Sequence, residues 1–147
     1  MIRKLTKDDE QLYKQLAWEF YHSSAVLHPV PEKNIDATFK ELMRSDEYTE
    51  CFIFEKDENA AGFALIAKTF SQEAGGLVCW IEELFIRDEY RGQGIGSEFL
   101  TEYEKIMPKG TKRLRLEIEP DNELAAKLYK RMGYDFLGYA QMVKELN

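Results

Sequence analysis

The sequence has 147 residues, 44% of them hydrophobic and 32% charged, which is the composition of an ordinary soluble globular protein. This length is that of a single domain, and we expect residues 1–147 to form one. The formal net charge of -7 argues against sequence-independent nucleic-acid binding, because such binding needs a basic face that releases counterions. The negative charge suits a cationic partner, although solubility explains it equally well.

The two cysteines indicate neither a metal site nor a disulfide. Cys51 and Cys79 each lie alone in an apolar run, without CxxC or Cys/His spacing, so we expect small buried thiols in a reducing compartment. No apolar run approaches the ~20 residues of a membrane span. The polar start of the chain also lacks the apolar stretch of a signal peptide. We therefore expect a cytoplasmic protein that binds no metal and no membrane.

The first fifty residues are predicted to form one short strand and two helices. Residues 2–5 fit a strand, and Thr6 can cap a helix over about 7–21, with Asp9 at the third helical position. Two prolines end that helix. A second helix is expected at about 32–44, with apolar residues at helical spacing.

The rest of the chain alternates strands with two further helices. Strands are expected in residues 51–55, 62–70, 77–86 and 113–119, with helices at about 95–107 and 120–132. Residues 134–146 are predicted to form two last strands that meet near Gly138. The predicted order is β-α-α-β-β-β-α-β-α-β-β, an α/β fold in which helices cover a mixed sheet.

The most informative segment is a glycine turn between a strand and a helix, Arg91-Gly-Gln-Gly-Ile-Gly96. Glycines let the backbone turn sharply, and the helix that follows adds unpaired N–H groups, so the turn can bind a phosphate. A plain strand-to-helix turn is the alternative. A P-loop is disfavoured because no Lys-Ser/Thr follows Gly96, and a dinucleotide fold because too little chain remains.

Two motifs resemble the GNAT superfamily of acetyl-CoA-dependent N-acetyltransferases. WIEELFIRDEYRGQGIGSEFL, residues 80–100, is similar to the family's R/Q-x-x-G-x-G/A signature with the strand before it and the helix after it. The second motif is Asn122-x-x-Ala125-x-x-Leu128-Tyr129, followed by Gly133-Tyr134. The predicted order of elements also matches the family's fold. Within the superfamily the central motif is most similar to spermidine/spermine-type small-amine enzymes.

The resemblance implies which residues bind the acetyl donor. The backbone of Leu84, Phe85 and Ile86 would pair with the pantetheine arm as an added strand, at a place where the strand bulges away from its neighbour. Asn122 would contact the same arm, although capping its helix explains an asparagine there. The turn would bind the pyrophosphate through Arg91, Gly92, Gln93, Gly94, Ile95, Gly96 and Ser97.

The same resemblance implies a general acid and a general base. Tyr129 would protonate the leaving thiolate, the alternative being that it only packs in the apolar stripe of its helix. Glu82 is the expected base and Glu83 the alternative, with solvent as a third; strand alternation predicts that the two side chains point to opposite faces. His22 and His28 lie where the family builds its acceptor pocket, but loop histidines are usually solvated.

These inferences together predict an N-acetyltransferase that moves an acetyl group directly from acetyl-CoA, its cosubstrate, to a primary amine of a small molecule. A protein N-terminal or lysine acetyltransferase is one alternative. A CoA-binding regulatory module without turnover is another. The sequence does not identify the acceptor amine or the oligomeric state. Because dimers are common in the family, a homodimer is one possibility to test.

Overall fold

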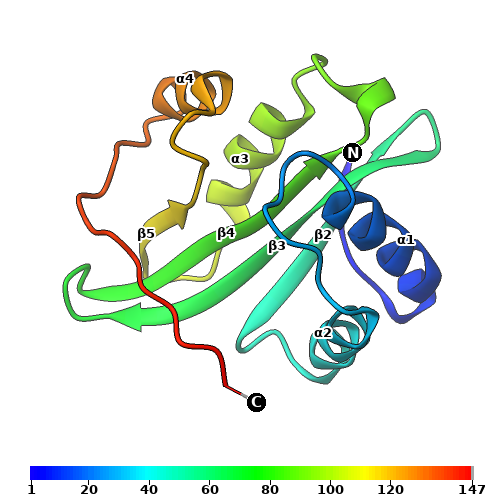
Figure 1. Cartoon of the computed structure of the whole chain (residues 1–147), viewed down its shortest axis with the longest axis horizontal. Helices are drawn as coiled ribbons and strands as arrows, with labels where there is room; N and C mark the ends of the chain where they lie inside the picture. The colour runs from blue at the N-terminus through cyan, green and yellow to red at the C-terminus, as the bar shows by residue number, and fades with distance from the viewer. Residues whose placement is uncertain (147) are drawn as a thin grey trace. The chain divides into compact units, whose positions relative to one another are not determined.

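The computed structural model describes residues 1–146, which divide into two compact parts, residues 1–117 and residues 118 onward. The first part contains the sheet (Figure 1), and the second contains one helix, α4 (Glu123–Arg131). Among the described residues no helix is both long and apolar enough to cross a membrane.

The first part holds five strands, three α-helices and two short 3-10 helices. The strands are β1 (Ile2–Lys4), β2 (Thr49–Lys56), β3 (Asn59–Ser71), β4 (Gly76–Ile86) and β5 (Thr111–Leu116). The α-helices are α1 (Glu10–Tyr21), α2 (Glu32–Arg44) and α3 (Ile95–Ile106), and the 3-10 helices are η1 (Lys7–Asp9) and η2 (Asp88–Tyr90). The strands lie in the order β1-β2-β3-β4-β5. All neighbours are antiparallel except β5, which runs parallel to β4.

Both faces of this sheet are covered by helices. Because successive strand residues point to opposite faces, β2 sends Cys51 and Ile53 to one side and Phe52 and Phe54 to the other. The first pair belongs to a buried cluster with residues of α1 and α2, and the second pair stacks against aromatic rings of α3. Figure 1 shows α1 and α2 together on one face and α3 on the other.

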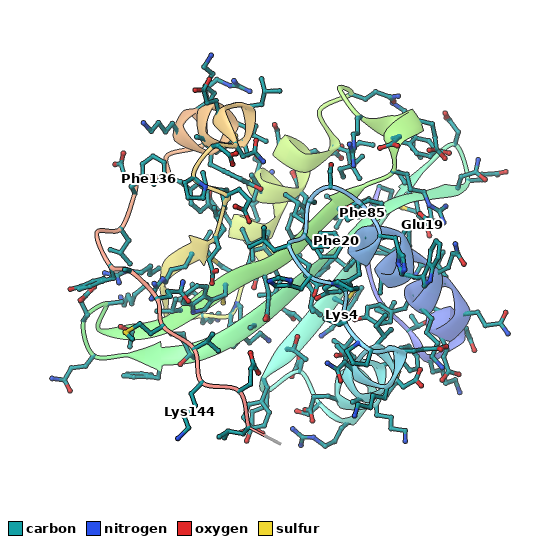
Figure 2. The ribbon with its side chains drawn as sticks, viewed as in Figure 1. Lys4, Glu19, Phe20, Phe85, Phe136 and Lys144 are labelled. Atoms are coloured by element: carbon teal, nitrogen blue, oxygen red, sulfur yellow. The ribbon has the colours of Figure 1, made fainter. Side chains whose placement is uncertain are left out.

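The end of α1 is anchored on the part of β4 that leads to the glycine turn. The rings of Phe20 and Phe85 pack edge to face with centroids 5.9 Å apart, and Figure 2 shows them close together. Glu19 accepts two hydrogen bonds from the guanidinium of Arg87, at 2.9 and 3.0 Å. These contacts place the C-terminal turn of α1 beside the end of β4.

The start of α1 differs slightly from the prediction. The helix expected over residues 7–21 begins as η1 and continues as α1. The Asp9 carboxylate accepts a hydrogen bond from the Thr6 N–H at 2.8 Å. It also forms a bidentate ion pair with Arg3, with N–O distances of 2.8 and 2.9 Å. The Arg3 hydrogen bonds outweigh the effect of burial and lower the pKa of Asp9 to about 2. Strand β1 is thereby tied to the first helix.

The predicted order of elements is confirmed through α4, but the two strands expected in residues 134–146 are not formed. A stretch of β-forming residues becomes a strand only where its backbone joins a sheet, and the five-stranded sheet does not include residues 134–146. The described chain therefore ends in irregular structure after Gly133.

Candidate active site

The site begins where β4 and β5 part. The parallel pairing runs only from Leu77 to Ile81 on β4, where β5 ends at Leu116, whereas β4 continues to Ile86. The last residues of β4 therefore have a strand partner, β3, on one side only.

The free edge of β4 exposes backbone groups in a defined pattern. The Arg87 N–H donates to the Ala61 carbonyl at 2.8 Å, so alternation turns the backbone groups of Phe85 toward β3 and those of Leu84 and Ile86 toward the open edge. Arg91 already donates to the Ile86 carbonyl through Nε at 3.0 Å. Of the three predicted arm-binding residues, Leu84 and Ile86 thus present backbone to the edge, whereas Phe85 contributes its ring to the core.

The glycine turn follows the open edge after η2. Gly92 and Gly94 have φ of 73° and 79°, a left-handed backbone that side chains with a Cβ rarely adopt. Gly94 is the N-cap of α3, and its carbonyl accepts from the Glu98 N–H at 2.9 Å. The N–H groups of the three residues between them, Ile95, Gly96 and Ser97, have no acceptor within the helix. Unpaired N–H groups at a helix N-terminus, together with the helix dipole, can bind an anion.

The two polar side chains of the turn lie at the surface. Arg91 forms an exposed ion pair with Asp88, with Nη1 3.1 Å from Oδ1. Gln93 accepts from Lys56 of β2 and donates to the Glu89 carbonyl at 3.3 Å. These contacts tie the turn to the β2–β3 hairpin and to η2.

A β-bulge lies in β4 immediately before the open edge. On β3, Leu65 pairs with Glu83 and the next residue, Ile66, pairs with Ile81, so Glu82 is the extra residue without a partner. Both glutamates therefore line the same cavity. The bulge expected in this stretch is thus present, and on either side of it Glu82 is exposed whereas Glu83 is buried.

This cavity, of about 570 Å³, is lined by the end of α1, the loop after it, β3, β4 and the residue after β5. Its volume lies within the usual range of ligand sites. Three carboxylates, from Glu82, Glu83 and Glu117, share it with aromatic and apolar side chains. The lining residues besides these acids are Phe20, Tyr21, Ala25, Val26, Ala67, Lys68, Thr69, Trp80 and Ile81.

Glu83 is the buried acid of the cavity, with 9% of its surface exposed. Its Oε2 accepts a hydrogen bond of 2.6 Å from the hydroxyl of Tyr21. Its Oε1 is buried and has no hydrogen-bond partner among the described residues. Burial raises the pKa of Glu83 to about 7, with the Tyr21 hydrogen bond opposing the shift and the charge of Glu82 adding to it. One oxygen is thus fixed by Tyr21, and the other is buried without a hydrogen-bond partner among the described residues.

Glu82 and Glu117 form the more exposed side of the same cavity. Burial raises the pKa of Glu82, and the neighbouring charge of Glu117 raises it further. Two basic side chains, Lys68 of the cavity lining and Arg115 of β5, have other partners. Lys68 pairs with Glu50 at 3.4 Å and donates to the Asp46 carbonyl, while the Arg115 guanidinium stacks over the ring of Trp80 at 4.0 Å.

The structure places Tyr21 and Glu117 in the lining of the cavity, which the sequence alone does not predict. Tyr21 ends a predicted helix and Glu117 lies in a predicted strand, and neither position by itself indicates a site. The register of β5 on β4 brings Glu117 beside Glu82, and no local pattern encodes that register. His22 does not line the cavity, since its ring stacks on Trp18 and its Nδ1 lies 2.8 Å from the Trp18 carbonyl.

Two predicted site residues lie in the second part of the chain. Asn122 caps α4, accepting from the Ala125 N–H at 3.1 Å, so its capping role is confirmed. Tyr129 lies on α4 with its ring edge to face against Tyr134, at 5.8 Å between centroids. The cofactor contact of Asn122 and the acid role of Tyr129 remain predictions.

Residues 10–134 match the acetyltransferase (GNAT) family, and the chain belongs to this family. An uncharacterized N-acetyltransferase of Methanocaldococcus jannaschii is 29% identical over 99% of this chain and 66% of its own length. A spermine/spermidine N(1)-acetyltransferase of Bacillus subtilis is 35% identical over 46% of this chain and 49% of its own length. The chain therefore spans about half to two thirds of these curated relatives, and the likeness to spermidine-type enzymes covers less than half of it.

The fold is shared with solved acetyltransferases. The aminoglycoside N-acetyltransferase AAC(6')-Iy, in complex with the bisubstrate analog CoA-S-monomethyl-acetylneamine, has a TM-score of 0.82 at 17% identity, covering 100% of this chain and 98% of that one. GNAT acetyltransferases use acetyl-CoA as the acetyl donor. The open edge of β4 and the unpaired N–H groups in the first turn of α3 fit such a donor, because the edge can pair with an extended chain and the N–H groups can bind an anion.

Proposed function

We propose that this chain is an N-acetyltransferase that transfers the acetyl group of acetyl-CoA to a primary amine of a small molecule. The observation that carries the proposal is Glu83, a buried carboxylate with one oxygen held by Tyr21 and the other without a partner, in a cavity next to the open edge of β4. A general base is most useful when its pKa lies near the working pH, and the pKa of Glu83 is raised to about 7.

The donor would bind through backbone more than through side chains. Leu84 and Ile86 would pair with the pantetheine arm along the open edge, and the N–H groups of Ile95, Gly96 and Ser97 would bind the pyrophosphate. Arg91, Gln93 and Asn122 are proposed to flank the donor. Bound in this way, the thioester supplies an activated acetyl carbon next to the cavity.

The acceptor would react in one direct transfer. Its ammonium gives one proton to Oε1 of Glu83, and the neutral nitrogen attacks the thioester carbonyl carbon. A C–N bond forms, and the C–S bond breaks with its electron pair going to sulfur. Tyr129 donates a proton to that sulfur and recovers one as the new amide nitrogen loses its second proton. The products are the N-acetylated amine and the CoA thiol, and Glu83 releases its proton to solvent.

The sequence favoured Glu82 as the base, and Glu82 remains the alternative. Glu83 is preferred here because Glu82 is exposed and lacks a hydrogen bond that fixes its carboxylate, whereas Tyr21 orients Glu83. A base must lie at a defined position to accept a proton in the transition state.

Release of CoA thiol from acetyl-CoA, measured with a panel of primary amines, tests the proposal. We expect amine-dependent thiol release together with an acetylated amine detected by mass spectrometry. Binding of acetyl-CoA without thiol release for any small amine would indicate a regulatory module instead. Release with peptides alone would indicate a protein acetyltransferase.

A further inference from the structure

The last turn of α1 is joined to the end of β4 by three contacts that follow one another. Alternation along the strand turns every second residue from position 83 onward to the α1 side, and each of them contacts a different residue of that turn. The three pairs are Arg87 with Glu19, Phe85 with Phe20 and Glu83 with Tyr21. Glu19, Phe20 and Phe85 of these pairs can be followed in Figure 2. The series ends at Glu83, the proposed base.

We infer that Arg87 is a positioning residue for acetyl transfer. Its ion pair with Glu19 fixes the last turn of α1, and this turn holds the Tyr21 hydroxyl on Glu83. The inference rests on the proposed function, because it gives Arg87 a part in that reaction. Arg87 is not among the residues that line the cavity, so its part in the reaction is exerted through other residues.

Arg87 is held more firmly than an ordinary surface arginine. Its guanidinium donates to both carboxylate oxygens of Glu19 and, through Nη1, to the Ala60 carbonyl at 3.0 Å. Its backbone N–H donates to the Ala61 carbonyl. The exposed fractions of the Arg87 and Glu19 side chains are 22% and 26%, so water screens this pair less than a surface pair. One side chain thus joins α1, β3 and the end of β4.

The position of Tyr21 depends on such an anchor, because α1 ends at this residue and the next helix begins only at Glu32. The contacts of the last turn therefore decide where its hydroxyl lies. A hydrogen bond weakens steeply as its length and angle depart from the preferred values, and the bond from Tyr21 to Glu83 is 2.6 Å long. Glu19 lies two residues before Tyr21, so release of Glu19 would let the hydroxyl move away.

The ion pair would act on Glu83 by position and not by its own charge. Burial raises the pKa of Glu83, the Tyr21 hydrogen bond lowers it and the charge of Glu82 raises it. Neither Arg87 nor Glu19 is among these causes. The ionisable groups around Glu83 are Tyr13 and Tyr21 of α1, Cys51 of β2, Lys68 of β3, Glu82 of β4 and Glu117 after β5. If the Tyr21 bond is weakened, burial is opposed less and the pKa of Glu83 should rise.

The test follows the titration of Glu83 by NMR of ¹³C-labelled glutamate carboxyl groups, with Glu83→Gln identifying its signal. Arg87→Lys keeps the charge but lacks the planar fork that donates to both oxygens of Glu19. We expect Arg87→Lys and Glu19→Ala to raise the midpoint for Glu83 by about half a pH unit to one unit. Tyr21→Phe, which removes the hydrogen bond itself, should raise it by about one unit. The rise of kcat/KM with pH should shift by the same amounts.

Glu10→Ala is the matched control, because it makes the same substitution in the same helix and breaks an exposed pair with Lys14. It should leave the midpoint unchanged. Glu19→Ala added to Tyr21→Phe should cause no further rise, since each change removes the same hydrogen bond.

Unchanged midpoints in Arg87→Lys and Glu19→Ala, or a further rise in the double variant, would overturn the inference. A fall in Glu19→Ala would also overturn it, because loss of a negative charge by itself favours the ionised form of Glu83. Absence of thiol release with every amine would instead contradict the proposed function. The NMR titration needs no turnover, so it distinguishes the two failures.

Discussion

Glu83 shows how one residue can be unfavourable for folding and useful for chemistry. Burial disfavours its charged form, and the single hydrogen bond from Tyr21 compensates only in part. The same burial brings its pKa to about 7, where a carboxylate can both accept and release a proton. Two predictions follow from this balance, one for activity and one for stability.

Activity should depend on pH through Glu83. Below a pH of about 7 its carboxyl is protonated and cannot accept a proton, so kcat/KM should rise as the pH increases through this region. Glu83→Gln should lower activity by about 10²–10⁴ near neutral pH, the usual range for general catalysis. Glu82→Gln is the paired variant and should cost far less. If Glu82→Gln were the more damaging change, the roles of the two glutamates would be exchanged.

The free energy of unfolding should depend on pH in the opposite sense to kcat/KM: it should fall as the pH rises through the pKa of Glu83. The pKa of the Glu83 carboxyl rises from its ordinary 4.5 to about 7 on folding. Its contribution to stability is therefore fully present only below pH 4.5 and is lost as the pH rises through 7. Glu83→Gln removes the buried charge, so the variant should be more stable than the parent at pH 8, by up to about 3 kcal/mol. Urea unfolding at pH 5 and pH 8 measures this difference. If the stability of Glu83→Gln relative to the parent protein is the same at pH 5 and pH 8, the charge of Glu83 is not destabilising.

At the scale of elements, the site depends on how α1 is attached at both ends. Its first turn is tied to β1 through Arg3, Asp9 and Thr6, and its last turn carries Tyr21 to Glu83. Both ends of α1 are therefore held in place by hydrogen bonds to the sheet or to residues beside it.

Asp9→Asn tests this attachment. The pKa of Asp9 is lowered from 3.8 to about 2, so the stabilisation from its charge is present above pH 3.8 and lost as the pH falls through 2. At pH 7 the variant should lose about 1–2 kcal/mol, allowing for the solvent around Arg3. Thermal unfolding at pH 7 measures the loss, and Asp8→Asn on the exposed side of the same turn is the control. Equal stability of both variants would show that the Arg3 pair contributes nothing.

The sequence predicted the helices and the central strands because their periodicity is local. It also located the glycine turn and the free edge before it, since both lie within one short motif. Where pairing between distant segments decides the outcome, the prediction failed or had no basis. The approach of Tyr21 to Glu83, for example, joins residues 62 positions apart. Residues 134–146 have strand-like composition, but they do not join the described sheet.

At the scale of the whole molecule, acetyl transfer requires the donor-binding segments and the cavity to act together. Two acids of the cavity, the edge of β4 and the turn before α3 follow one another along the stretch from Glu82 to Ser97, whereas most of the cavity lining comes from other segments. If the edge and the turn bind no acetyl-CoA, the cavity has no acetyl group to transfer.

Calorimetric titration with acetyl-CoA therefore tests the central claim most directly. We expect the parent protein to bind, and Gly94→Val to bind at least tenfold more weakly, because a β-branched residue disfavours the left-handed φ of 79° that orients the N–H groups of the turn. Gly110→Val is the matched control: its φ is 89°, and at both glycines an added Cβ would meet no atom within 4 Å, so the backbone strain is alike. Gly110→Val should bind acetyl-CoA like the parent. Absence of binding by the folded parent protein, or equal binding by both valine variants, would contradict the account.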